Sequence, residues 1–216
     1  MNRHGKLVNV LITGFATGTY EANCYLVAPR SGAQAIVIDP GEDVVGTLDY
    51  YFDVNGLTPA AVLLTHGHPG HTASAAELCE QWDIPVYIHA ADRPMLGASD
   101  SGEPERVLEF ADGDQLQIAD ILVTVDHTPG HTDGSVVFRV TAESDEGDVP
   151  VAFTGDTLSF RSIGRSDVAG EDGHRLLGSV TDKLMVLDDK TVVLPGHGQS
   201  TSIGAERRFH PNLPRI

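Results

Sequence analysis

The sequence predicts an α+β fold in which two β-sheets are covered by helices. Short runs rich in Val, Ile and Leu recur along the chain and end at Gly, Pro or Asp, as β-strands do. Helical stretches, with apolar residues at spacings of three and four, separate the later runs, whereas only turns separate the early ones. A doubly wound parallel sheet would alternate strands with helices throughout, so two sheets fit this pattern better.

The strands are expected where β-branched and apolar residues follow one another. In chain order they are residues 7–13, 23–28, 35–38, 61–65, 86–89, 121–125, 135–140, 149–154 and 191–194. Helical periodicity predicts helices at residues 43–54, 72–82 and 173–187, with a shorter one at 203–208. The acidic stretch 142–148 lies between two expected strands, which predicts an exposed hairpin loop.

Length and composition predict a single domain, residues 1–216, that can bury a sizeable core, because the chain has 216 residues and 41% hydrophobic content. The formal charge of −17 argues against nucleic-acid binding, which relies on Lys and Arg to neutralise phosphates. No apolar run approaches the roughly 20 residues of a membrane helix, and residues 1–15 lack a signal-peptide pattern. We therefore expect a cytoplasmic protein with neither nucleic-acid nor membrane partner, and the sequence leaves its oligomeric state open.

The chain has two cysteines, too few for a disulfide framework and not arranged as a CxxC pair. Cys24 lies in the segment NCYLV, which is typical of a strand, so it is expected to be a small buried hydrophobe. We assign no chemical role to Cys24 or to Cys79.

Polar side chains that can bind a metal follow four of the expected strands. They lie in the segments THGHPGH, TPGH, TGDT and LPGHG, where a Gly or Pro turn follows the strand and displays an imidazole or carboxylate on a loop. The candidate ligands are His66, His68, His71, His131, Asp156 and His197. His66 and His68 are expected to approach one ion, and His71, where a helix begins, a second ion. Nitrogen and carboxylate donors suit Zn, Fe or Mn better than Ca or Mg.

The other histidines carry no such pattern. A single histidine more often forms a hydrogen bond or lies at the surface than binds a metal. We therefore assign no metal role to His4, His89, His127, His174 and His210.

Eight segments, taken together, resemble one protein family. They are NCYLV (23–27), VIDPG (37–41), LLTHGHPGH (63–71), TPGHTDGS (128–135), FTGDTL (153–158), SIGRSD (162–167), VVLPGHG (192–198) and TSIGAER (201–207). In these segments the chain resembles the metallo-β-lactamase superfamily and, within it, the small bacterial glyoxalase II-like proteins, or hydroxyacylglutathione hydrolases. The resemblance implies an αββα sandwich with metal ions at one edge. It also implies hydrolysis of an S-2-hydroxyacyl thioester by a metal-activated water.

The resemblance assigns a role to each candidate ligand. It implies that His66, His68 and His131 hold a first metal, that His71 and His197 hold a second, and that Asp156 bridges both ions and orients the attacking water. The family signature HxHxDH has an aspartate where this chain has Gly70. We therefore expect one or two ions, with zinc the first expectation, and a second site that is weak or empty, since even changes around the ligands cost about 10- to 100-fold in affinity. Water, or a neighbouring acid such as Asp167 or Asp172, is a candidate substitute for the missing ligand.

Two further residues have two interpretations each. Asp39, in VIDPG, is either a structural partner behind the ligand loops or a turn-forming aspartate before a proline. Arg165 either meets an acidic substrate or ties loops together by hydrogen bonds, which is the more usual role of such an arginine. The C-terminal helical domain that contributes glutathione contacts in eukaryotic glyoxalase II has no counterpart after residue 198, so another cellular thiol remains open.

Two alternative functions remain beside the hydrolase. A persulfide dioxygenase of the same superfamily would bind one iron through His66, His131 and Asp156, although SIGRSD and TSIGAER favour the hydrolase. A non-catalytic metal-binding relative would explain Gly70, but fold alone does not require five histidines and an aspartate to occur together. No residue indicates β-lactam hydrolysis.

Overall fold

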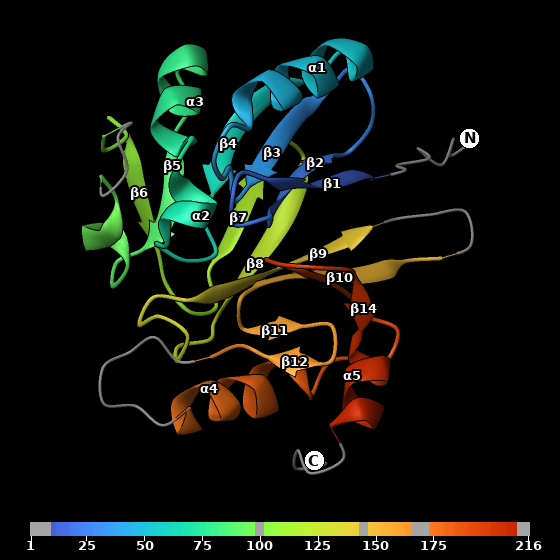
Figure 1. Ribbon diagram of the computed structural model, residues 1–216. Coiled ribbons are helices and arrows are strands. Elements are labelled where there is room, and N and C mark those ends of the chain that lie inside the picture. Colours follow the sequence, from blue (N-terminus) through green and yellow to red (C-terminus); the bar gives the residue numbers. More distant parts are fainter. Residues whose placement is uncertain (1–9, 98–101, 143–146, 166–172, 211–216) are drawn as a thin grey trace.

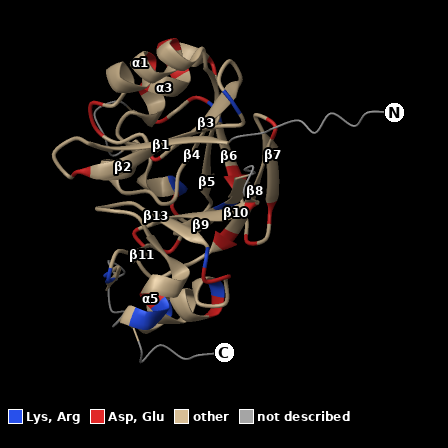
Figure 2. Ribbon diagram, turned by 90° about the vertical axis from the view of Figure 1, so that its right-hand side faces the viewer, with Lys and Arg blue, Asp and Glu red and all other residues tan. Residues whose placement is uncertain are grey.

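The computed structural model describes residues 10–97, 102–142, 147–165 and 173–210. Two six-stranded sheets face each other, and two views at right angles show α1 and α3 on one outer side and α5 on the opposite side (Figure 1, Figure 2). This arrangement confirms the predicted αββα sandwich with two mixed sheets flanked by helices.

The first sheet begins as an antiparallel meander and continues as parallel strands. Its order is β1 (Leu11–Thr17), β2 (Ala22–Ala28), β3 (Gln34–Ile38), β4 (Thr58–Leu63), β5 (Val86–His89) and β6 (Val107–Phe110). Neighbours from β1 to β3 are antiparallel, and neighbours from β3 to β6 are parallel. Parallel neighbours need crossover connections: α1 (Val45–Asn55) lies in the one from β3 to β4, and α3 (Ala75–Trp82) in the one from β4 to β5.

The second sheet is antiparallel except at one pair. Its order is β14 (Thr201–Ser202), β13 (Val192–Pro195), β10 (Val149–Gly155), β9 (Val136–Ala142), β8 (Ile121–His127) and β7 (Gln115–Ile118), with β10 and β13 parallel. A separate hairpin of β11 (Leu158–Ser159) and β12 (Ser162–Ile163) lies near it. Two helices cover the outer face of the second sheet. They are α4 (His174–Ser179), which continues as a π-helix over Val180–Leu184, and α5 (Ile203–Phe209).

Three apolar clusters hold the layers together. The cluster between the sheets follows the period of two of a strand: Ile121, Val123 and Val125 of β8 are buried in it, whereas Leu122 is exposed. A second cluster lies between the first sheet and its helices, and a third between the second sheet and its helices. The stiff core thus holds the strand ends, and the loops that follow them, in fixed positions.

The observed elements agree with the expected ones at most positions. The expected strand 7–13 corresponds to β1, which continues to Thr17, and its residues 7–9 lie outside the described ranges. The expected helix 72–82 is divided into α2 (Pro69–Thr72) and α3, and the expected helix 173–187 is divided into α4 and the π-helix. Residues 143–146 of the expected hairpin loop lie outside the described ranges. Among the described helices, none is long and apolar enough to cross a membrane.

Candidate metal centre

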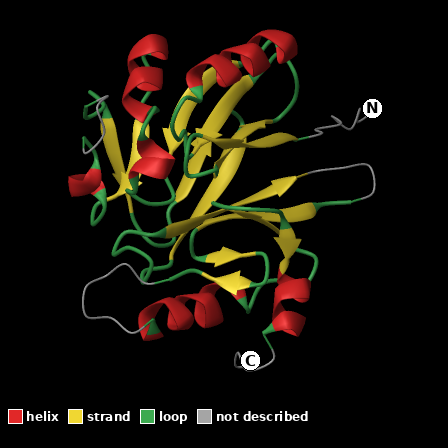
Figure 3. Ribbon diagram, in the orientation of Figure 1, coloured by secondary structure: helices red, strands yellow, loops and turns green. Residues whose placement is uncertain are grey.

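The six candidate ligands follow the strands β4, β8, β10 and β13: His71 lies in the short helix α2, and the others lie in the connections after the strand ends. Figure 3 shows the strands of the two sheets and the loops that connect them. The donor atoms of the six ligands form two clusters: His66, His68 and His131 in one, and His71, Asp156 and His197 in the other. Within each cluster the atoms lie within 4.8 Å of one another. Five of the six, all but the buried His66, line a pocket of about 450 Å³ together with Tyr20 and Arg165.

Asp156 lies between the two clusters. Its Oδ2 is 3.5 Å from Nε2 of His131 and 3.5 Å from Nε2 of His197. Its Oδ1 is 3.6 Å from Nε2 of His71, which in turn is 3.4 Å from Nε2 of His197. In the first cluster, Nδ1 of His68 is 3.0 Å from Nε2 of His131. One carboxylate therefore reaches donor atoms of both clusters.

Asp39 sets the protonation of two of the imidazoles from behind. Its Oδ2 accepts from Thr65 Oγ1 at 2.6 Å and lies 3.0 Å from His71 Nδ1, so that nitrogen carries the proton. Thr65 Oγ1, having donated its own proton, accepts from His66 Nδ1 at 3.1 Å. In its neutral form, each imidazole then has an unprotonated Nε2. The structure thus places Asp39 as a partner behind the ligand loops, the first of its two interpretations.

The backbone carbonyl of Arg165 does the same for His131. It lies 2.8 Å from His131 Nδ1, and because a carbonyl can only accept, Nδ1 carries the proton and Nε2 has a free lone pair. Arg165 therefore ties a ligand loop through its backbone, and its side chain borders the pocket.

Burial and neighbouring charges shift the pKa values of two buried imidazoles, His66 and His71, in different directions. Burial, together with the neighbouring histidines, lowers the pKa of His66 well below its usual value, so its ring is neutral. Burial also acts to lower the pKa of His71, but the hydrogen bond and charge of Asp39, helped by Asp156, outweigh it and raise that pKa overall. A neutral His66 can donate its lone pair to a cation.

The structure contains buried donor atoms that fit a metal ion. His66 Nε2 and Asp156 Oδ1 are buried and have no hydrogen-bond partner. A buried acceptor without a partner costs about 1–3 kcal/mol, and both of these atoms lie among imidazole donors. A divalent cation bound by these donors would give such an atom a partner, so the residues present fit a metal.

The sequence reasoning missed Asp92, which joins the two loops of the first cluster. This carboxylate is 1% exposed and accepts from Gly67 N at 2.9 Å, Thr132 Oγ1 at 2.7 Å and Gly134 N at 2.7 Å. Asp92 follows β5, as the candidate ligands follow their own strands, and this position in the sequence could have indicated that it lies near the site. Asp92 thus positions the loops of His66, His68 and His131.

Asn23 and Tyr25 of β2 anchor the loop of His197. The Asn23 side chain donates to the carbonyls of Pro195 and Gly198, both at 2.9 Å, and the Tyr25 hydroxyl donates to the Pro195 carbonyl at 2.7 Å. Gly196 is required between them, because a Cβ there would collide with Asp156 Oδ1. The segment NCYLV therefore matters for the site as well as for the sheet.

A family comparison agrees with this geometry. The family model described as the metallo-beta-lactamase superfamily matches residues 17–197. The chain belongs to the metallo-β-lactamase superfamily. An uncharacterised protein of Mycobacterium tuberculosis is 51% identical over 94% of this chain and 98% of the relative. The probable metallo-hydrolase YqgX of Bacillus subtilis is 34% identical over 91% of this chain and 94% of the relative. The hydroxyacylglutathione hydrolase GloC of Haemophilus influenzae is 30% identical over 90% of this chain and 93% of the relative.

Solved structures of the superfamily share the fold. A B3 metallo-β-lactamase, BLEG-1, superimposes with a TM-score of 0.80 at 31% identity, covering 94% of this chain and 99% of that one. TTHA1623 in a di-iron-bound form superimposes with a TM-score of 0.77 at 34% identity, covering 93% of this chain and 100% of that one. ETHE1 from Myxococcus xanthus superimposes with a TM-score of 0.76 at 28% identity, covering 94% of this chain and 84% of that one. Superfamily members are mostly metal-dependent hydrolases, and the di-iron neighbour shows that the metal of this chain is not established by its fold.

Gly70, where the superfamily signature has an aspartate, borders the pocket next to Tyr20. A Cβ at Gly70 would lie 3.5 Å from the Tyr20 Cβ, an ordinary contact, so the site has room for a Cβ. Within the described residues, Asp156 is the carboxylate of the second cluster, and Asp39 lies on the other side of the His71 ring. The suggested substitutes Asp167 and Asp172 lie outside the described residues. The second cluster therefore has two imidazoles and one carboxylate.

The histidines given no metal role lie outside these clusters where they are described. His89 and His127 stack on each other at 4.2 Å between ring centroids, and His127 Nε2 is 2.9 Å from the Asp133 carbonyl. His174 begins α4, and His210 follows α5. His4 lies outside the described residues.

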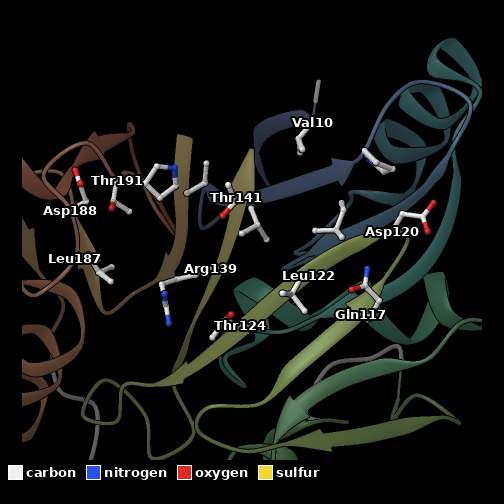
Figure 4. A pocket seen from close by; sticks show the side chains of 15 residues that line it. Val10, Gln117, Asp120, Leu122, Thr124, Arg139, Thr141, Leu187, Asp188 and Thr191 are labelled. Atoms are coloured by element: carbon white, nitrogen blue, oxygen red, sulfur yellow. The ribbon is translucent and has the colours of Figure 1, made fainter. Parts of the chain in front are cut away.

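A further hollow of about 490 Å³ lies on the second sheet and shares no lining residue with the metal pocket (Figure 4). Leu122, Thr124 and Arg139 of β8 and β9 form part of its wall. The Arg139 guanidinium is already paired with the Asp126 carboxylate, so this hollow offers no free charge through that residue. The metal pocket is the better candidate for chemistry.

Proposed function

We propose that this chain is a metal-dependent thioester hydrolase of the glyoxalase II type, acting on an S-2-hydroxyacyl thiol. The observation that carries the proposal is the Asp156 carboxylate, placed between two imidazole clusters in an accessible pocket. The similarity to the hydroxyacylglutathione hydrolase of Haemophilus influenzae supports the choice of a thioester.

The first cluster is proposed to hold the tighter metal and the second a weaker one. His66, His68 and His131 would supply three nitrogens to the first ion, and His71 and His197 two to the second, with Asp156 shared. Zinc is the proposed metal, and iron or manganese would accept the same donors. A bound ion lowers the pKa of a water toward about 7 and polarises the substrate carbonyl.

The chain's own residues then position the reactants. Asp156 accepts a hydrogen bond from the attacking water and so directs its lone pair toward the carbonyl carbon. Asp39 and the Arg165 carbonyl keep the protons of His66, His71 and His131 on Nδ1, which holds each Nε2 toward the pocket. The departing thiolate needs no strong acid, because a thiol pKa is about 8.5.

The proposal also covers the substrate class, the partners and the cellular location of the protein. The substrate is proposed to be a small-molecule thioester, and the formal charge of −17 disfavours nucleic acid as a partner. We also propose a cytoplasmic, single-domain protein without a membrane partner.

Element-resolved metal analysis of freshly purified protein, together with thioester turnover, tests the function. We expect between one and two ions per chain and hydrolysis of S-lactoylglutathione or an S-lactoyl ester of another thiol, lost on chelation and restored by zinc or manganese. Full metal loading with no turnover of any thioester would contradict the hydrolase and leave a non-catalytic metal-binding protein.

A persulfide dioxygenase is the second candidate, and Gly70 favours it. A single iron held by His66, His131 and Asp156 would not need the second site, and a structural neighbour is ETHE1 from Myxococcus xanthus. Iron content and oxygen uptake with glutathione persulfide distinguish the two functions. Oxygen uptake without thioester hydrolysis would replace the hydrolase by the dioxygenase.

A further inference from the structure

A third hollow, of about 360 Å³, lies beside α5 at the turn of the β11–β12 hairpin. Its lining residues Phe160, Arg161, Arg208 and Phe209 are exposed, and we call them the 160/208 patch. The hairpin connects this patch to the metal pocket, because Ser159 of β11 lines the metal pocket and the next residue, Phe160, lines the patch.

Arg161 lies between two aromatic rings. Its guanidinium carbon is 4.9 Å from the centroid of the Phe160 ring and 5.3 Å from that of the Phe209 ring. Such cation–π contacts hold the guanidinium while leaving its N–H edge free to donate. The two rings remain 37% and 48% exposed, so each still offers apolar surface to a ligand.

The turn that carries Arg161 is held in place by a buried carboxylate. Glu206 of α5 is 1% exposed, and its Oε2 accepts from the backbone N of Arg161 at 2.9 Å. Its Oε1 accepts from Thr201 Oγ1 at 2.7 Å. Arg161 has a positive φ of 55°, a conformation that such a bond helps to hold. The patch is therefore organised before any ligand arrives.

The arginine side chains of the 160/208 patch form no ion pairs within the described ranges, whereas most of the other arginine side chains there do. Arg93, Arg106, Arg139, Arg175 and Arg207 all form ion pairs with carboxylates. No carboxylate lies within ion-pair distance of the Arg161 or Arg208 side chain in the described part of the chain. Figure 2 shows basic residues gathered on α5, in a protein whose formal charge is −17. Unpaired cations between exposed rings suit an anion that carries a planar ring.

We propose that the 160/208 patch binds the nucleotide end of the substrate's thiol carrier. The two guanidinium groups would donate to its phosphates, and the phenyl rings would pack against its base. At about 3.3 Å per extended residue, the four residues from Asp156 to Phe160 span at most roughly 13 Å, so an elongated carrier is needed to join the two sites. The inference rests on the proposed thioesterase function and specifies its substrate as a thioester of a nucleotide-bearing thiol, such as coenzyme A.

Equilibrium binding to metal-free protein tests the patch without any turnover. Adenosine 3′,5′-bisphosphate is titrated by calorimetry into the wild type, the double variant Arg161→Ala/Arg208→Ala and the control Arg30→Ala, an exposed arginine whose side chain bonds the Ser31 carbonyl. We expect the double variant to bind about 10-fold more weakly and the control to bind as the wild type. Equal binding by all three proteins, or binding of inorganic phosphate as tight as that of the nucleotide, would overturn the nucleotide site.

Kinetics on two thioesters of the same acid separate this inference from the proposed function. The ratio of KM for lactoyl-coenzyme A to KM for S-lactoyl-N-acetylcysteamine is expected to rise about 10-fold in the double variant. Hydrolysis of both esters with an unchanged ratio would overturn the patch and leave the thioesterase standing. Weakened nucleotide binding in a protein that hydrolyses neither ester would support the patch and overturn the thioesterase.

Discussion

At the scale of a single side chain, Gly70 provides a test of the proposed second metal site. Replacing it by aspartate adds a carboxylate to the residue before His71, and its Cβ would meet Tyr20 at 3.5 Å, an ordinary contact. We expect Gly70→Asp to raise the metal content toward two ions per chain and the affinity for the second ion by at least about 10-fold. Metal analysis and competition with a chromogenic chelator measure both quantities, and thioester hydrolysis is expected to increase with them.

Gly70→Ala is the matched control for this substitution. It adds the same Cβ without a carboxylate, so metal content is expected to remain that of the wild type. If Gly70→Asp and Gly70→Ala behave alike, the missing aspartate is not what limits the second site.

Cys79 gives the protein a predictable response to alkaline pH. Burial raises its pKa to about 12 from a usual value of 9.0, and the opposing charge of Arg106 does not cancel this effect. Above pH 9 the unfolded chain therefore loses a proton that the folded chain keeps, so the free energy of unfolding falls as pH rises. Urea titrations at pH 8 and pH 10 are expected to show a smaller fall for Cys79→Ala than for the wild type. An identical fall in both would show that Cys79 is not protected.

The residues of the centre were predictable where they share a local pattern, and not otherwise. His66 and His131 each follow an apolar strand, so the pattern was enough to predict that their side chains lie together. Asp92 stands in no such motif, and its role depends on contacts with Gly67 and Gly134 that only the folded chain creates. The choice between the two interpretations of Asp39 depended on its distances to Thr65 and His71, which the sequence cannot supply.

At the scale of elements, length and burial decide what the sequence reveals. Long apolar strands such as β2 and β10 were predicted nearly to their ends. The sequence did not reveal β6, β7, β11, β12 or β14. Gln115–Ile118 alternates exposed and half-buried residues, and β11 and β12 have two residues each, too few for a periodicity to appear.

Asn23 links an element to the site and provides a test at this scale. Asn23→Ala removes one of the two side-chain donors to the buried Pro195 carbonyl and the side-chain donor to the Gly198 carbonyl, which is expected to cost about 0.5–1.5 kcal/mol per hydrogen bond in the free energy of unfolding. The loop of His197 loosens as a result, so the second metal is expected to weaken more than the first. Denaturant titration and cobalt binding measure the two effects.

Asn55→Ala is the control for Asn23, because its side chain donates only to the Tyr51 carbonyl of its own helix. It is expected to leave cobalt binding as in the wild type. Equal weakening of both metals in Asn23→Ala would mean that Asn23 supports the whole edge of the sandwich rather than one loop.

At the scale of the whole molecule, the metal centre joins the two sheets. His66, His68 and His71 follow β4 of the first sheet, whereas His131, Asp156 and His197 follow strands of the second. The sheets otherwise meet through the apolar cluster between them, which makes no use of the metal. A bound ion therefore adds a polar crosslink at one edge of an interface that is apolar elsewhere.

Removal of the metal is expected to lower the melting temperature of the whole chain. An ion that binds only the folded state stabilises it by about 2.7 kcal/mol when its free concentration is 100 times Kd. For a chain of this size that corresponds to roughly 5–10 °C, measurable by calorimetry before and after chelation. His131→Ala, which breaks the first cluster, is the control and is expected to melt at the same temperature with or without chelator. Wild-type curves that coincide with and without metal would show that the ion does not connect the two sheets.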